Sequence, residues 1–144
     1  FRMFATNESS GIIIAGGGRF GCCLAEQLSI ADENVLIIDT SSESFNKLIP
    51  EFPGSTLEGD AGSIDVLRQA GISRARAVIA ATDNDNVNLM IAQIAREIYD
   101  VPAVIAVVND PNLLSAKEDF DFLILCPYWV MTQEVIKDLK MKEG

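Results

Sequence analysis

The sequence predicts a single α/β domain built on a doubly wound parallel sheet with helices on both faces. Six short apolar segments alternate with segments of helical character from residue 11 onward, which is typical of repeated strand–helix–strand units. Hydrophobic residues make up 49% of the chain but aromatic residues only 7%. Such an aliphatic-rich composition is expected for strands buried on both faces. The 144 residues are about the length of one domain.

The first half of the chain contains three of the six predicted strands. Periodicity places strands over about 11–16, 34–39 and 55–58, with the last of them following the Pro53-Gly54 turn. A helix over about 19–31 joins the first two strands. A shorter helix over about 42–49 opens at a Ser-Ser-Glu sequence and ends before Pro50, as capping rules predict.

The second half continues the alternation. A helix begins at Ser63, and Gly71 ends it as a C-cap. Strands are predicted over about 77–81, 103–108 and 121–125, and helices over about 86–99, 111–118 and 128–141. Met90 lies in an apolar stripe of the helix over 86–99 and is expected in the core. Tyr128 and Trp129 open the last helix, where they either cover the sheet or face a partner.

The turn after the first strand has the pattern G-x-G-x-x-G in Gly16-Gly17-Gly18-Arg19-Phe20-Gly21. Gly16 allows the tight turn, Gly18 leaves room for a pyrophosphate, and Gly21 lets the helix approach the strand. A helix that starts here offers free N–H groups and the positive end of its dipole to phosphates. The pattern therefore predicts a Rossmann-like sheet, strand order 3-2-1-4-5-6, that binds a nucleotide.

Asp39, followed by Thr40, ends the second predicted strand. A carboxylate at this position can accept hydrogen bonds from both ribose hydroxyls. It also repels a 2′-phosphate, so NAD(H) or ATP/ADP is favoured over NADP. The residues alone do not rank NAD(H) against ATP/ADP.

The ligand of such a sheet lies across the carboxyl ends of the strands. Arg19 is the base of the glycine loop and can contact phosphate. Asp60 and Ala61 end the third strand, on the adenine side. The predicted nucleotide-binding set is Gly16, Gly17, Gly18, Arg19, Phe20, Gly21, Asp39, Thr40, Asp60, Ala61, Ala81, Thr82 and Asp83. Asp60, Asp83 and Asp85 would bind a divalent cation if they clustered, but solvated acids are favoured and no metal is predicted.

Charge and composition exclude several partners. The net charge is −10, with 21 acidic and 11 basic residues, and no basic stripe supports nucleic-acid binding or attraction to an anionic membrane. No segment reaches the ~18 apolar residues of a membrane span, so direct membrane insertion is not expected. The three cysteines are expected to be buried apolar residues rather than a disulfide framework. Residues 1–10 have no pattern and are expected to be a disordered or artificial leader to a domain over 11–144.

Several segments resemble one family in order. They are G-G-G-R-F-G, V-L-I-I-D-T, E-G-D-A followed by L-R-Q-A-G-I, A-V-I-A-A-T-D-N-D, and V-N-D-P. Together they resemble the nucleotide-binding N-terminal domain of Trk/Ktr-type potassium-transport regulatory subunits and RCK domains, also called TrkA-N or KTN domains. The resemblance spans about 11–140, and the segment from Glu58 to Ile72 is more specific than the glycines.

The resemblance implies a domain that binds NAD(H) or ATP/ADP without turning it over. It implies a homodimer or higher ring that gates a membrane-embedded potassium channel or transporter subunit, and a cytoplasmic location on the inner face of the cell membrane. By position in the family's motifs, the resemblance assigns each part of the predicted set a role. The phosphate loop is Gly16 to Gly21, the ribose-binding acid is Asp39, the adenine side is Asp60 and Ala61, and the tip of the fourth strand is Ala81 to Asp83. Val107 stands where many members of the family carry an arginine. Whether this chain replaces any ligand contact of that arginine is left open. Such regulators usually continue into a second, smaller domain.

The alternative is a fragment of an NAD-dependent dehydrogenase or reductase. Such an enzyme needs a substrate region and a group that moves a proton near neutral pH. The chain has no histidine and no Y-x-x-x-K pair, and its lysines mostly fall outside the predicted cleft. The sequence therefore favours a nucleotide-sensing regulatory domain over an enzyme.

Overall fold

The computed structural model describes the backbone of residues 11–143 and the side chains through residue 140. The leader expected over 1–10 lies outside the described residues. The strands are β1 (Ile12–Ala15), β2 (Val35–Asp39), β3 (Ser55–Glu58), β4 (Ala77–Ala80), β5 (Ala103–Val107) and β6 (Leu123–Leu125). Every neighbouring pair is parallel, in the order β3-β2-β1-β4-β5-β6. The predicted fold class and strand order are confirmed.

The connections differ in type from the prediction. The α-helices are α1 (Arg19–Ile30), α2 (Ile64–Gln69), α3 (Asp85–Gln93) and α4 (Pro127–Glu143). The short helices predicted over 42–49 and 111–118 are 3₁₀ segments, η1 (Ser42–Lys47) and η4 (Pro111–Asp119), and a further one is η2 (Ile72–Arg74). The helix predicted over 86–99 is α3 followed by a π-helical turn, η3 (Ile94–Ile98).

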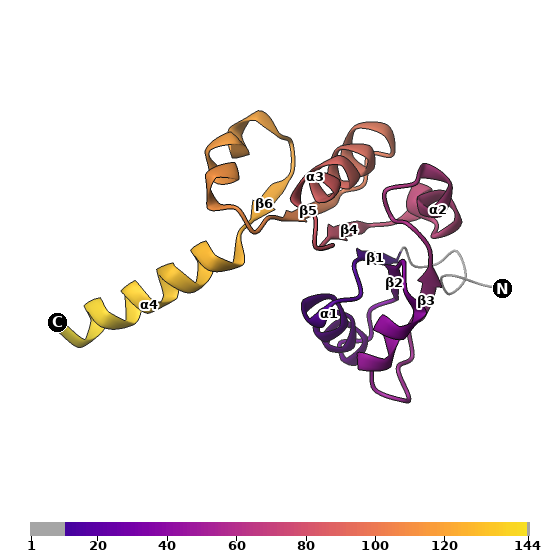
Figure 1. Cartoon of the computed structure of the whole chain (residues 1–144), viewed down its shortest axis with the longest axis horizontal. Coiled ribbons are helices and arrows are strands. Elements are labelled where there is room, and N and C mark those ends of the chain that lie inside the picture. The colour runs from indigo at the N-terminus through magenta and orange to yellow at the C-terminus, as the bar shows by residue number, and fades with distance from the viewer. Residues whose placement is uncertain (1–10, 144) are drawn as a thin grey trace.

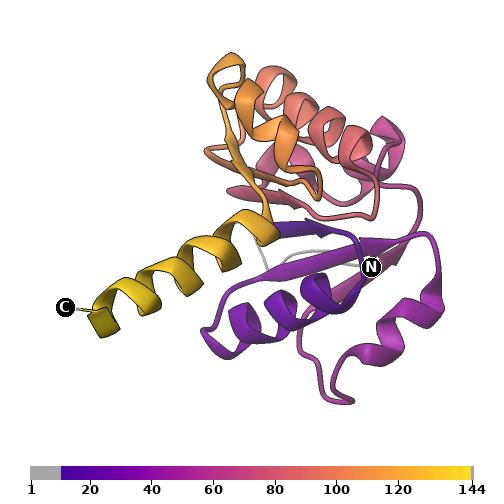
Figure 2. The same cartoon turned by 60° about the vertical axis from the view of Figure 1, so that its left-hand side comes forward.

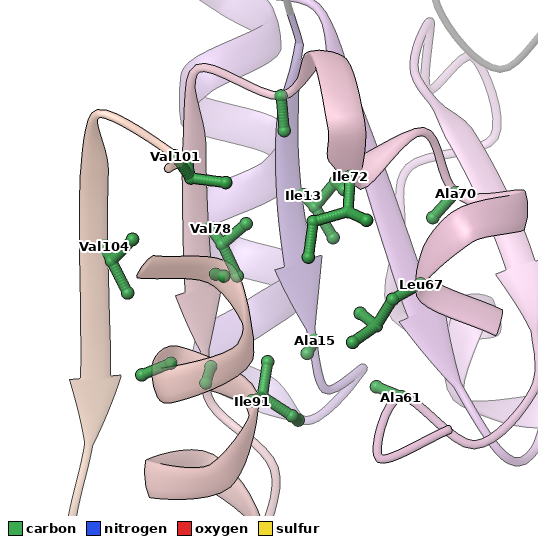
Figure 3. Packing of buried hydrophobic residues seen from close by; sticks show 14 of the residues in the cluster. Ile13, Ala15, Ala61, Leu67, Ala70, Ile72, Val78, Ile91, Val101 and Val104 are labelled. Carbon is green, nitrogen blue, oxygen red and sulfur yellow. The ribbon is translucent and has the colours of Figure 1, made fainter. Parts of the chain in front are cut away.

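The sheet separates two apolar layers. On one face, Ile13, Leu36 and Val78 pack beneath α2, η2 and α3 together with Leu67 and Ile91, as Figure 3 shows for the residues it labels. On the other face, the alternate strand positions pack against α1 and η1. Successive side chains along each strand point alternately into one layer and the other, so β1, β2 and β4 are buried on both faces. Because these strands are parallel, their carboxyl ends lie at the same edge of the sheet.

The final helix does not cover the sheet. In Figures 1 and 2, α4 projects away from the body of the domain. Tyr128 and Trp129 are 61% and 51% exposed. Of the two alternatives, the structure does not support a cover over the sheet, and a role toward a partner stays a prediction. Within residues 11–143, no helix has both the length and the apolar character needed to cross a membrane.

Met90 is also outside the core, contrary to its prediction. The buried stripe of α3 and η3 consists of Asn88, Ile91, Ala92 and Ala95. Met90 flanks that stripe and is 41% exposed. Its terminal methyl would lie 3.3 Å from a Cβ atom added at Gly62, so the side chain packs over the turn after β3 rather than under the sheet.

Candidate functional site

A cleft of about 630 Å³ crosses the carboxyl ends of the strands, a volume typical of small-molecule sites. It lies at the switch point between β1 and β4, from which the chain continues to β2 and β3 on one side and to β5 and β6 on the other. Ligands bind at this point in doubly wound sheets. Every residue of the predicted set except Gly17 lines it. The lining residues are Gly16, Gly18, Arg19, Phe20, Gly21, Ile38, Asp39, Thr40, Ser44, Gly59, Asp60, Ala61, Ala81, Thr82, Asp83, Asn84, Val87, Val107, Asn109 and Pro127.

The three motif glycines serve different purposes. Gly16 has φ +121°, and a Cβ there would clash with the carbonyl oxygen of Ala81. A Cβ at Gly21 would clash with the carbonyl oxygen of Gly16, so these two positions close the turn between β1 and α1. A Cβ at Gly18 would meet no atom within 4 Å, and its φ of −74° suits any residue. The protein itself therefore does not need glycine at position 18.

Gly17 is not among the residues that line the cleft, and it holds Asp39. Its N–H donates to Asp39 Oδ2 at 2.7 Å, and the N–H of Ser41 donates to Oδ1 at 2.9 Å. Burial raises the pKa of Asp39, but these N–H groups, the Ser44 hydroxyl and the charge of Lys47 outweigh it, so the pKa lies below its ordinary value. Asp39 is consequently an oriented carboxylate at the edge of the cleft.

The N-terminus of α1 faces the same cleft without a capping side chain or an acidic residue in its first turn. Its first N–H groups have no intrahelical acceptors, as at any helix start. Arg19 and Phe20 are both exposed there. A cation at this position opposes the helix dipole, and a bound anion would relieve that opposition.

The adenine-side residues occupy the turn after β3. The N–H of Gly62 donates to Asp60 Oδ1 at 2.8 Å, while the side chain of Asp60 remains exposed. Ala61 is 5% exposed and belongs to the core beneath α2 and α3. This turn therefore offers the cleft one carboxylate and a small apolar wall.

The β4 and β5 ends form the opposite half of the cleft. Asp85 accepts hydrogen bonds from the N–H groups of Asn109 at 2.8 Å and Asp110 at 3.0 Å. Asn84 caps α3 by accepting from the N–H of Val87 at 3.0 Å. Among the residues described, no group of three or more metal-ligating side chains comes together. Asp60, Asp83 and Asp85 thus form no cation site here.

Sequence reasoning missed several lining residues. Asn84 and Asn109 follow strand ends, and that position could have identified them. Val107 ends β5, and the sequence marks it only as a departure from a family pattern. Ser44 and Pro127 come from η1 and the start of α4, and no sequence signal places them at the cleft.

Comparison with known proteins adds a family and a fold. The family model of the TrkA-N domain matches residues 12–120. The Trk system potassium uptake protein TrkA of Streptomyces coelicolor is 39% identical over 101 residues, which cover 70% of this chain and 45% of that protein. The chain thus spans less than half the length of this relative.

Two solved structures are similar over nearly the whole chain. The TrkA-N domain of the inner membrane protein ybaL from Escherichia coli has a TM-score of 0.78 at 18% identity, covering 93% of this chain and 99% of that one. GsuK bound to ADP has a TM-score of 0.72 at 28% identity, covering 96% of this chain and 36% of that one.

Proposed function

Because this chain belongs to the TrkA-N domain family, we propose that it is a regulatory domain that binds NAD(H) or ATP/ADP at the cleft. The nucleotide acts as a signal and is released unchanged. GsuK, a channel protein, has been solved with ADP bound, which supports an adenine nucleotide as the ligand class.

The observation that carries this proposal is the space above Gly18. A glycine at that position is not required by packing or by φ, yet the chain leaves the space empty next to a helix N-terminus. A pyrophosphate that approaches the backbone requires such a gap. Gly18 and the first N–H groups of α1 are therefore proposed to contact the phosphates, with Arg19 as a charged partner.

Asp39 is proposed to bind the ribose. Each carboxylate oxygen has more than one acceptor site, so the bonds from Gly17 and Ser41 leave capacity for hydroxyl groups. Because the pKa of Asp39 lies below its ordinary value, the group is charged at neutral pH and disfavours the 2′-phosphate of NADP.

The cleft is poor in groups that move protons. Histidine, lysine, tyrosine and cysteine do not occur among the described residues that line it, and the chain contains no histidine. General acid–base chemistry near pH 7 needs a side chain of that kind or a carboxyl group with a raised pKa. Binding without turnover is therefore proposed.

The regulated partner is proposed from the relatives. The matched protein of Streptomyces coelicolor is named for potassium uptake, so we propose a membrane potassium channel or transporter as the partner, reached from the cytoplasmic side. A homodimer or larger ring would convert a change of ligand into a change of subunit angle. A coupling of ~1–3 kcal/mol would bias such a gate 5-fold or more.

The experiment is isothermal titration calorimetry with NAD⁺, NADH, ADP and ATP on the wild type and on Gly18→Ala. The methyl group finds no neighbour within 4 Å, so the variant is expected to unfold at the same or a slightly higher urea concentration. Its nucleotide affinity is expected to fall at least about tenfold because the methyl occupies the phosphate position.

Two arginines supply a matched control. Arg19 lines the cleft, whereas Arg74 is exposed at the end of η2, just before β4 begins. Arg19→Ala should weaken binding and Arg74→Ala should not. Failure of all four nucleotides to bind the wild type, or full affinity in Gly18→Ala, would remove the proposed site.

A further inference from the structure

Asn88 is a buried amide beneath the β4–β5 half of the cleft. It is 1% exposed and lies on α3, outside the lining of the cleft. Its Oδ1 accepts from the N–H of Thr82 at 2.9 Å and from the Thr82 hydroxyl at 2.6 Å. Its Nδ2 donates to the carbonyl oxygens of Thr82 at 3.0 Å and Val107 at 2.8 Å. All four hydrogen-bonding positions of the amide are used.

These partners determine the orientation of the amide and of the Thr82 hydroxyl. The reversed amide would point its oxygen at two carbonyl oxygens and its NH₂ group at an N–H, so only one orientation is compatible. Because Oδ1 carries no proton, the Thr82 hydroxyl must be the donor in the 2.6 Å bond. Thr82 lines the cleft, yet its backbone N–H and its hydroxyl both donate to Asn88 and not toward the cleft.

Other backbone donors at these strand ends are also occupied. The N–H of Asn84 donates to Thr82 Oγ1 at 3.2 Å. The N–H groups of Asn109 and Asp110 both donate to Asp85. Together with the N–H of Thr82, four backbone N–H groups at these strand ends are therefore used within the protein.

The side chains of this half offer the amide groups of Asn84 and Asn109 but no cationic donor. Its lining residues include the exposed carboxylate of Asp83 and the apolar side chain of Val107. Arg19, the cation among the described lining residues, belongs to the glycine loop after β1 and begins α1. A terminal phosphate over β4 and β5 would meet one carboxylate and no lysine or arginine of the described cleft lining, an arrangement that electrostatics disfavours.

We propose that the β4–β5 half of the cleft selects an uncharged or cationic group over a terminal phosphate, and that Asn88 is the positioning residue for this selectivity. The favoured ligands are nucleoside diphosphates whose outer phosphate is esterified to a hydroxyl-bearing group, including dinucleotides. Nucleoside triphosphates are disfavoured. The inference rests on the proposed function, since it assumes that the adenosine lies over β2 and β3.

The test compares ADP-ribose with ATP by calorimetry at low salt without divalent cations, with ADP as a reference. The two ligands share ADP and differ only in a terminal ribose or phosphate. ADP-ribose is expected to bind about tenfold more tightly than ATP, the scale of a hydrogen bond to a charged group. Equal or tighter binding of ATP would overturn the selectivity. If ADP itself fails to bind, the proposed function is wrong, and this inference is lost with it.

Three variants test the role of Asn88 and of the carboxylate. Asn88→Ala frees both Thr82 donors, so the preference for ADP-ribose over ATP should shrink about threefold or more even if both ligands bind more weakly. Asp83→Asn, an exposed and isosteric change, should shrink the preference without loss of stability. Asn86→Ala, an exposed asparagine of the same helix outside the cleft, should leave it unchanged.

An unchanged ratio in Asn88→Ala would mean that Asn88 has only a structural role and would overturn its assignment. If Asn88→Ala does not fold, the decision rests on Asp83→Asn, whose unchanged ratio would overturn the electrostatic argument.

Discussion

Replacing Asp39 with alanine should destabilise the protein even without a ligand, because Asp39 holds the glycine loop. The change removes the acceptor of two backbone N–H groups, those of Gly17 at 2.7 Å and Ser41 at 2.9 Å. A hydrogen bond to a charged group contributes ~1.5–3 kcal/mol. Partial exposure of the loop lets water replace part of that contribution, so we expect a loss of about 2–3 kcal/mol in the free energy of unfolding near pH 7.

The effect should depend on pH with a defined sign. The pKa of Asp39 is lower in the folded protein than the ordinary value of an aspartate carboxyl group. A carboxyl group of this kind stabilises the fold above its unfolded pKa, and the contribution is lost as the pH falls through the folded pKa. The difference between the wild type and Asp39→Ala should therefore be largest near neutrality and should shrink below about pH 4.

Urea denaturation followed by circular dichroism, from about pH 7 down to about pH 3, measures this difference. Asp65→Ala is the matched control. Its carboxylate is 91% exposed and lies 3.5 Å from Arg68 on the same helix, so its removal should cost less than ~0.5 kcal/mol. Equal stability of Asp39→Ala and the wild type near pH 7, or a difference that does not change with pH, would refute the reasoning.

Three further outcomes follow from packing and burial. Gly21→Ala should unfold the domain or cost several kcal/mol in urea denaturation, because its Cβ would clash with the Gly16 carbonyl; wild-type stability would contradict the packing at this turn. Leu67→Ala should cost about 2–5 kcal/mol in the same assay, since Leu67 is fully buried; a loss under ~1 kcal/mol would mean that this layer repacks. Cys23 should react quickly with a thiol reagent in the native protein, while Cys22 is protected, because it is buried and burial raises its pKa; rapid labelling of Cys22 by mass spectrometry would contradict that burial.

Much of the fold could be predicted because its signals are local. The buried strands read as continuous apolar runs such as Ile12 to Ile14, and Gly71, at φ +89°, ends a helix as its residue type suggests. The position of α4 could not be predicted in this way. Its apolar residues are compatible with packing on the sheet or on another surface, and periodicity does not distinguish the two.

The cleft was predicted to the extent that its residues follow strands or form the glycine loop. Gly17 does not line the cleft, and its N–H donates to Asp39. The motif alone does not indicate which glycine faces a ligand, so contact of Gly17 with a nucleotide stays a prediction. Asn88 was not identified as part of the site. A polar residue six positions after Thr82 gains its role only when α3 folds back over β4 and β5.

The most direct test of the central claim is an NMR titration of the ¹⁵N-labelled protein with ADP. We expect the largest shifts of amide resonances at Gly18, Arg19 and Phe20 and at the turn of Asp60 and Ala61, while the resonances of the exposed face of α4 remain unchanged. Shifts confined to α4, or no shift at the glycine loop at saturating ADP, would contradict the claim.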